Sequence, residues 1–327
     1  MITMNNLMKR KSGNAKFCLL LLSFVVALPT VSSARSPLTT NDYQGAPPII
    51  NQVVLKPGDA KRAAAKGLGE FNAQIPSYDG KGNLIASWTP SENVSVNWTF
   101  VIVHGGNGIG GIDYNQAKTL RENFNANVLI LDSFWSRGTT YNGGEVNRLK
   151  LGQRIDANDR AFDLNAAGKW LSAKGVDPKK TVVFGGSQGG WTALRAMTNE
   201  PLLLELTKPY YSFGIAIYPA CEPGRYKRWL ALGPYHGPML VLTGGRDIGN
   251  PSSDCDSVTL NSATKWVEFP EATHGWNRPT GAFDEPSVDG DCSKAHYAKG
   301  QNNSMCYSER RTRETYELIA EIIGYQK

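Results

Sequence analysis

Short apolar runs separated by longer amphipathic stretches repeat along the chain from about Leu84 onward. Six runs rich in β-branched residues predict strands, and in chain order they read WTFVIVHGG, NVLILD, KTVVFGG, SFGIAIYPA, PMLVLTGG and TKWVEFP. Most are continuously apolar, which is typical of parallel strands covered on both faces. Helical patterns lie between and after them, at 113–125, 156–173, 188–198, 252–263 and 308–323. The alternation predicts an α/β fold, a doubly wound and mostly parallel sheet flanked by helices on both faces.

The first 34 residues have the pattern of a secretory signal peptide. A basic region at 9–16 is followed by the apolar run FCLLLLSFVVAL and by the small residues SSA. The apolar run is too short to span a bilayer, which takes about 20 helical residues. We therefore expect residues 1–34 to be removed on export. Residues 35–327 are then expected to form one α/β domain without a membrane span, in the periplasm or outside the cell.

Removal of this segment changes the charge of the chain. The full sequence of 327 residues carries 35 Lys and Arg against 29 Asp and Glu, a formal net charge of +6. Four of the basic residues and none of the acidic ones lie in the signal, so the mature chain is close to neutral. It has no basic cluster with interleaved aromatic residues, and we expect no nucleic-acid partner.

Four cysteines remain after the signal, Cys221, Cys255, Cys292 and Cys306. An even number in an exported protein predicts two disulfides, but the spacing leaves all three pairings open. A zinc site is the weaker interpretation, because no C-x-x-C pair supplies two closely spaced thiolates. We expect neither a metal nor an organic cofactor.

The stretch VVFGGSQGGW, residues 182–191, places one serine among four glycines, directly after a predicted strand and before a predicted helix. Gly185, Ser187 and Gly189 match the G-x-S-x-G pattern of a nucleophile elbow. In such a turn, small neighbours let the strand and the helix approach closely, and the serine takes a strained backbone conformation. The sequence predicts Ser187 as a nucleophile; the alternative is a glycine-rich turn with an incidental serine.

A serine nucleophile needs a base and a carboxylate that orients the base. Asp247 in LTGGRDIGNP directly follows a predicted strand, at the carboxyl end of the sheet where sites gather in α/β folds. His274 in ATHGW follows the last predicted strand. The order Ser187, Asp247, His274 is that of an α/β-hydrolase triad, whereas the alternatives are a turn-forming aspartate and a structural histidine. Other candidates are His104, His236 and His296 for the base and Asp254, Asp256 and Asp284 for the acid.

The loop HGGNGIGG supports two interpretations. Its glycines match the G-x-G-x-x-G of a dinucleotide-binding loop, and Asp132 ends the next strand where a ribose-binding acid is expected, which would indicate an oxidoreductase. The same loop fits an oxyanion hole, with Gly105 or Gly106 supplying one backbone N–H and Gln188 the other. We favour the oxyanion hole because it assigns one chemistry to both glycine-rich stretches.

Four further residues stand beside these motifs. Arg137 in SFWSRG follows a predicted strand, where it would either bind a substrate carboxylate or pair with backbone or an acidic neighbour as a structural arginine. Trp135, Trp191 and Trp276 either line an apolar substrate pocket or pack in the core.

These blocks together resemble the dienelactone hydrolase-like branch of the α/β-hydrolases. The matching stretches are FVIVHGGNG, LILDSFWSRG, DANDRAFDLNAAGKWL, VVFGGSQGGWTAL, AIYPAC, VLTGGRDIGNPSSDC and ATHGW, in the family's order from about Gly80 to His274. The resemblance implies an α/β-hydrolase fold with Ser187, Asp247 and His274 as nucleophile, acid and base. It also implies a Cys221–Cys255 disulfide, with Cys292 and Cys306 as the second pair.

One departure from the family bears on the substrate. Well-characterised dienelactone hydrolases carry a cysteine nucleophile where this chain has Ser187, which favours general ester hydrolysis over lactone specificity. The segment 279–306 is also longer than the family usually has after the histidine. We expect an exported serine hydrolase that cleaves carboxylic esters of small molecules. A catalytically silent binding protein with a hydrolase fold stays as an alternative, and the sequence carries no sign of the oligomeric state.

Overall fold

The computed structural model describes residues 71–92, 98–106, 108–137, 155, 157–219, 221, 234–253, 255, 264–278 and 306–325. All of them belong to one compact unit, Pro37–Lys327. Three predicted features fall outside the described residues: the signal peptide, most of the predicted helix at 252–263 and nearly all of the segment 279–306.

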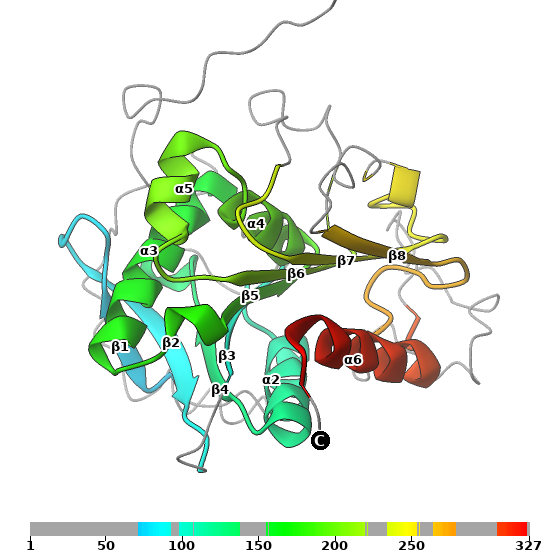
Figure 1. The fold of residues 1–327 in the computed structure, drawn as a ribbon, viewed down its shortest axis with the longest axis horizontal. Helices are drawn as coiled ribbons and strands as arrows, with labels where there is room; N and C mark the ends of the chain where they lie inside the picture. Colours follow the sequence, from blue (N-terminus) through cyan, green and yellow to red (C-terminus); the bar gives the residue numbers. More distant parts are fainter. Residues whose placement is uncertain are drawn as a thin grey trace, which may run out of the picture. The chain divides into compact units, whose positions relative to one another are not determined.

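An eight-stranded sheet forms the centre of the described structure, with strand order β1-β2-β4-β3-β5-β6-β7-β8 (Figure 1). The strands are β1 (Ala73–Pro76), β2 (Asn83–Thr89), β3 (Thr99–Val103), β4 (Asn127–Leu131), β5 (Thr181–Gly186), β6 (Phe213–Ile217), β7 (Met239–Gly244) and β8 (Thr264–Phe269). Strands β3 to β8 run parallel, whereas β2 is antiparallel to both β1 and β4. The six strands predicted from apolar runs are confirmed, and β1 and β2 are additions to them.

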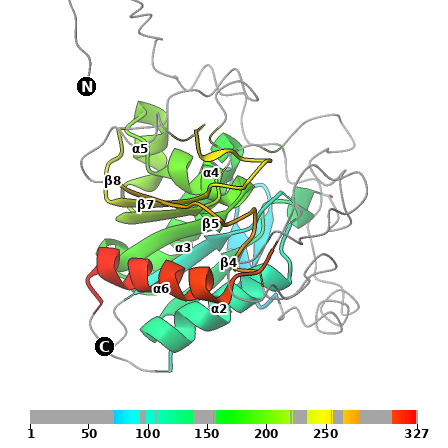
Figure 2. The same cartoon turned by 90° about the vertical axis from the view of Figure 1, so that its right-hand side faces the viewer.

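Helices cover both faces of this sheet. They are α2 (Gly111–Phe124), α3 (Ala157–Ala173), α4 (Gln188–Ala196), α5 (Pro201–Thr207) and α6 (Glu309–Ile323). Helices α3, α4 and α5 lie on one face, and α2 and α6 lie on the other (Figures 1 and 2). This arrangement confirms the predicted doubly wound α/β fold, although α5 was not among the predicted helices. Among the described helices, none is long and apolar enough to cross a membrane.

Alternate residues of each central strand enter two separate apolar cores. In β3, Phe100 and Ile102 pack in the core that contains residues of α2 and α6. Val101 and Val103 of the same strand pack in the core that contains residues of α3 and α4. A strand buried on both faces needs apolar side chains at every position, which explains the continuous apolar runs in the sequence.

The parallel register brings five loops to one edge of the sheet. Paired positions at this edge are Val103 with Gly185, Gly186 with Ile217, Ile217 with Leu242 and Gly244 with Phe269. Each of these strands ends here, so the loops after β3, β5, β6, β7 and β8 meet at their carboxyl ends. In α/β sheets this is the edge where ligands bind.

Candidate active site

Ser187 lies in the sharp turn between β5 and α4. Its backbone has φ 56° and ψ −123°, and it is the residue that precedes the first turn of α4. A positive φ is unfavourable for a residue with a Cβ and stores about 1–3 kcal/mol of strain. The Ser187 N–H donates to the carbonyl of Ile217 at 2.9 Å, which ties the turn to the end of β6. This is the strand, turn and helix context in which G-x-S-x-G indicates a nucleophile elbow.

The glycines on either side of Ser187 are required by close backbone contacts. A Cβ added to Gly189 would lie 1.9 Å from the carbonyl oxygen of Val103, and one added to Gly185 would lie 2.4 Å from the backbone of Gly189. Real side chains do not approach backbone atoms so closely. The absence of side chains therefore lets α4 begin directly against β3 and β5.

Gly189→Ala is expected to lower the free energy of unfolding by about 3 kcal/mol, the upper end of the usual cost of overpacking, because its methyl group would overlap the β3 backbone. Urea unfolding followed by circular dichroism measures the loss. Gly105→Ala is the matched control, since a Cβ there would meet its nearest atom at an ordinary 3.7 Å. Equal urea midpoints for the two variants would contradict the packing of α4 against β3.

Asp247 and His274 form a buried hydrogen-bonded pair. Asp247 follows β7 and His274 follows β8, and Asp247 Oδ2 lies 2.7 Å from His274 Nδ1, with side chains 0% and 7% exposed. The second carboxylate oxygen, Oδ1, accepts the backbone N–H groups of Gly249 at 3.0 Å and Asn250 at 2.9 Å. With the carboxylate oriented in this way, Nδ1 of His274 carries the proton and Nε2 is the basic nitrogen.

Tyr218 lies between the Ser187 turn and His274, and the sequence analysis did not single it out. It follows β6 with a positive φ of 38°, and its ring centroid lies 4.8 Å from that of His274. The same ring lies 2.7 Å from the position of a Cβ on Gly186, directly before Ser187. The glycine thus makes room for the tyrosine, and one aromatic ring packs against both the turn and the histidine loop.

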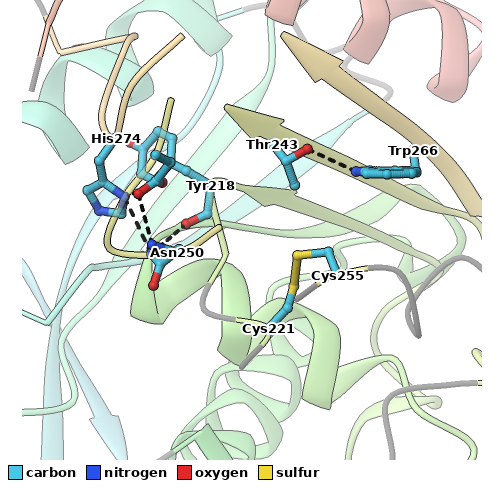
Figure 3. The surroundings of a disulfide bond; sticks show 8 residues. Tyr218, Cys221, Thr243, Asn250, Cys255, Trp266 and His274 are labelled. Carbon is cyan, nitrogen blue, oxygen red and sulfur yellow. Dashed lines mark hydrogen bonds and ion pairs between the residues drawn. A yellow bond between two sulfur atoms is a disulfide. The ribbon is translucent and has the colours of Figure 1, made fainter. Parts of the chain in front are cut away.

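Polar contacts fix Tyr218 in this position, and Figure 3 shows the one with Asn250. Its hydroxyl donates to Asn277 Oδ1 at 2.8 Å, and its carbonyl accepts the Asn250 side-chain amide at 3.2 Å. Burial raises the pKa of the Tyr218 hydroxyl above its ordinary value, so the group stays neutral. A signal for Tyr218 exists in the sequence, since it lies near the carboxyl end of the predicted strand SFGIAIYPA, directly before Pro219.

The two predicted sources of oxyanion donors flank Ser187. Gln188 is the first residue of α4, where backbone N–H groups have no acceptor within the helix. On the other side, a Cβ on Gly105 would lie 3.8 Å from Ser187 Cβ, so the loop after β3 runs directly beside the serine. Gly105 and Gly106 are half-buried. Both segments predicted to supply oxyanion donors therefore lie directly beside Ser187.

The Cys221–Cys255 disulfide implied by the family resemblance is present in the structure (Figure 3). It joins the loop after β6, which holds Tyr218, to the loop after β7, which holds Asp247. Cys306 is also disulfide-bonded. Cys292, its expected partner, lies outside the described residues, and this pairing stays a prediction.

Replacing both Cys221 and Cys255 by Ser is expected to lower the free energy of unfolding by about 3 to 4 kcal/mol, because the bond closes a loop with a sequence separation of 34. Urea unfolding of the variant and of the parent measures the difference. A parent treated with strong reductant is expected to unfold at a midpoint no higher than that of the variant, because the reductant also opens the disulfide of Cys306. An unchanged midpoint in the double variant would contradict a stabilising role.

Arg137 pairs with an acidic neighbour and with backbone, which is the structural role that the sequence analysis gave as the alternative to substrate binding. Its guanidinium binds both carboxylate oxygens of Asp163, at 2.7 and 2.9 Å, and donates to the Ser133 carbonyl at 2.6 Å. Both members of the ion pair are buried. Buried guanidinium groups are held by such paired contacts, and we assign Arg137 no part in the reaction.

Of the three tryptophans that the sequence analysis singled out, two have described side chains, and both are buried. Trp276 is fully buried, donates from Nε1 to Thr315 Oγ1 at 3.1 Å and packs edge-on against Tyr218 and Phe269. Trp191 is buried within α4. The side chain of Trp135 lies outside the described residues. Trp276 therefore supports the loop of His274 from the core side.

The position of Asp132 does not fit the dinucleotide-binding interpretation. Asp132 is fully buried, accepts the Phe134 N–H at 2.9 Å and lies 3.9 Å from His104 Nε2, so its carboxylate points into the protein rather than toward a ribose. Among the described residues, no three His, Cys, Asp or Glu side chains gather closely enough to hold a metal ion.

The other candidate residues divide into two groups. His104 is fully buried, and His236 precedes β7, at the opposite edge of the sheet from Ser187. Neither position suits a base for Ser187. The remaining candidates lie outside the described residues: His296, Asp254, Asp256 and Asp284.

Comparisons with known proteins agree with this architecture. No family model matches the chain, and no curated protein matches it. A solved structure from Klebsiella pneumoniae, described as a dienelactone hydrolase, matches with a TM-score of 0.56 at 14% identity, over 78% of this chain and 98% of that one. The dienelactone hydrolase-like promiscuous phosphotriesterase P91, from metagenomic libraries, matches with a TM-score of 0.50 at 14% identity, over 77% and 96% of the two chains. With the sheet order and the turn at Ser187, these similarities show that the chain has the α/β-hydrolase fold of dienelactone hydrolase-like proteins.

Proposed function

We propose that this protein is a serine hydrolase that cleaves carboxylic esters of small molecules. Ser187 is the nucleophile, His274 the base and Asp247 the orienting acid. The observation that carries the proposal is the buried Asp247–His274 hydrogen bond of 2.7 Å, at the same sheet edge as a serine with positive φ. Each group comes from the end of a different parallel strand, as in other α/β-hydrolases.

The proposed reaction begins with attack of Ser187 Oγ on the substrate carbonyl carbon. His274 Nε2 takes the hydroxyl proton as the new C–O bond forms, and Asp247 stabilises the resulting imidazolium. Backbone N–H groups of Gln188 and of Gly105 or Gly106 bind the oxyanion, each contributing about 3 kcal/mol to the barrier reduction. His274 then donates its proton to the leaving alcohol. Water activated by the same histidine releases the acid from Ser187.

Export of the protein is part of the same proposal. The N-terminal pattern at 1–34 supports it, and so does the Cys221–Cys255 disulfide, since stable disulfides form in oxidising compartments. Mass spectrometry of protein recovered outside the cytoplasm is expected to find residue 35 as the N-terminus. An unprocessed chain in the cytoplasm would contradict export.

The experiment that tests the proposed function combines turnover with covalent labelling. Chains starting at residue 35 are assayed with p-nitrophenyl acetate, butyrate and octanoate, and are treated with a fluorophosphonate probe. We expect turnover and a single probe adduct in the tryptic peptide 181–195, which contains Ser187. A folded parent that neither turns over nor reacts would favour the silent binding protein. Nicotinamide or flavin absorbance in purified protein would favour the oxidoreductase.

A further inference from the structure

A buried arginine binds the loop beside Ser187. Arg160 in α3 is fully buried, and its Nη2 donates to the His104 carbonyl at 2.5 Å. Within the described part of the chain, its Nε and Nη1 atoms have no hydrogen-bond partner. Burial lowers the pKa of Arg160 to about 10, so the group still carries its charge at neutral pH. Nearby Asp163, Asp132 and Asp113 favour the charged form. The His104 carbonyl is the acceptor that Nη2 reaches at 2.5 Å, and the same nitrogen lies 3.3 Å from His104 Nδ1.

That carbonyl belongs to the same peptide unit as the Gly105 N–H. A trans peptide is planar, and its C=O and N–H point in opposite directions, so fixing one fixes the other. A charged donor on the carbonyl oxygen also draws electron density away from the amide nitrogen, which makes the N–H a stronger donor. Arg160 thus controls both the direction and the strength of the Gly105 donor.

The His104 ring fixes the next peptide in the same way. Its Nε2 accepts the Ser133 N–H at 3.1 Å, so Nδ1 carries the proton and donates to the Gly105 carbonyl at 2.8 Å. Burial, together with the nearby Arg160 charge, holds the pKa of His104 well below its ordinary value and keeps the ring neutral. The peptide units on both sides of Gly105 are therefore oriented by buried side chains.

We propose that Arg160 is a positioning residue for the oxyanion hole: through the His104 carbonyl it orients and polarises the Gly105 N–H beside Ser187. This inference rests on the proposed function, because an oxyanion forms only if Ser187 attacks a carbonyl. Arg160 is buried and touches no substrate. Its loss should weaken binding of the transition state and lower kcat, with KM little changed.

Matched oxygen and sulfur substrates separate this role from a general structural one. In a thionoester, sulfur replaces the carbonyl oxygen and accepts hydrogen bonds poorly, so the oxyanion hole contributes less to its cleavage. Arg160→Met is expected to lower kcat for the ester roughly 10- to 100-fold, with a clearly smaller loss for the thionoester. Arg160→Lys keeps a charged donor, so its kcat for the ester is expected to fall less than that of Arg160→Met. This variant replaces Arg160→Met in the test if the Met variant does not fold.

The control variant is Arg195→Lys, at a buried arginine of α4 that pairs with Glu200 and Asn158. It is expected to keep the parent's ratio of ester to thionoester turnover. Equal losses on both substrates in the Arg160 variants, or a ratio that changes as much in Arg195→Lys, would overturn the inference.

A spectroscopic measurement tests the same peptide without turnover. Carbonyl-¹³C histidine combined with ¹⁵N glycine selects only glycines that follow a histidine, and these are Gly105, Gly237 and Gly275. Gly105→Ala removes one signal and thereby assigns it. In Arg160→Met, the Gly105 amide proton is expected to move upfield as its peptide loses the charged donor, while Gly237 keeps its position.

The two proposals fail in different ways. An unmoved Gly105 signal in an enzyme with Ser187-dependent activity would overturn the role of Arg160 alone. A parent without Ser187-dependent activity would contradict the proposed function, and the catalytic role of Arg160 with it.

Discussion

Ser187→Ala is expected to lower kcat for p-nitrophenyl butyrate by roughly 10⁵- to 10⁶-fold and to abolish labelling by a fluorophosphonate. The variant keeps the oxyanion donors and the Asp247–His274 pair but has no atom to form the acyl-enzyme. Folding should be little affected, because the Ser187 side chain makes no capping hydrogen bond to α4. Alanine also has the same backbone constraint at the positive φ. Kinetics, labelling and a urea melt measured on one preparation separate lost chemistry from lost fold.

The matched control is Ser212→Ala, at the start of β6 and the opposite end of the sheet. Its hydroxyl donates to the Lys179 carbonyl at 2.7 Å and has no relation to the proposed site. We expect parental turnover and parental labelling from this variant. Substantial turnover or labelling in Ser187→Ala would show that another group is the nucleophile.

Asp247→Asn is expected to lower kcat by about 10⁴-fold while the fold stays intact. The reason lies in the two backbone N–H groups, of Gly249 and Asn250, that point at Oδ1. In the variant these donors favour the amide oxygen at that position, which places the amide NH₂ against His274 Nδ1. The histidine must then carry its proton on Nε2, where it is unable to accept the proton of Ser187.

Two measurements test this effect: kcat across a range of pH and the rate of fluorophosphonate labelling. The value of kcat and the labelling rate are expected to fall together. Asp79→Asn is a suitable control, because Asp79 also accepts a backbone N–H in a loop but lies on a surface turn. It should behave as the parent does. Retention of more than a tenth of the parental kcat in Asp247→Asn would remove Asp247 from its proposed role.

The six parallel strands were predictable because burial on both faces requires apolar residues at successive positions, and such continuous apolar runs are easily recognised in the sequence. Strand β6 (Phe213–Ile217) reads FGIAI, with hardly a polar position to obscure it. Strand β2 reads NLIASWT and carries buried Ser87 among apolar residues, so neither a continuous run nor an alternation marks it. Helix α5 has only seven residues, too few to show a helical period.

The same reasoning explains which candidate site residues the sequence indicated. Ser187, Asp247 and His274 each follow a recognisable strand, and their order in the chain is informative. Arg160 lies 56 residues along the chain from His104, whose carbonyl it binds, and no local sequence pattern predicts that contact. The Asp163 partner of Arg137 likewise depends on how α3 packs, so the sequence left open whether Arg137 binds a substrate or pairs with an acidic neighbour.

The proposed base, His274, lies in the loop that follows β8, one of the two outer strands of the described sheet. Within the described part of the chain, strand β8 pairs with β7 alone, and most of its side chains are partly exposed. In addition to the backbone pairing of β7 and β8, Trp266 Nε1 donates a hydrogen bond to Thr243 Oγ1 at 2.9 Å (Figure 3). An edge strand of this kind opens locally at a lower free energy than the central strands, and its amide protons exchange sooner. Heat would then inactivate the protein by releasing His274 while β3 and β5 are still folded. The temperature of inactivation would therefore measure local opening of β8 and not unfolding of the core.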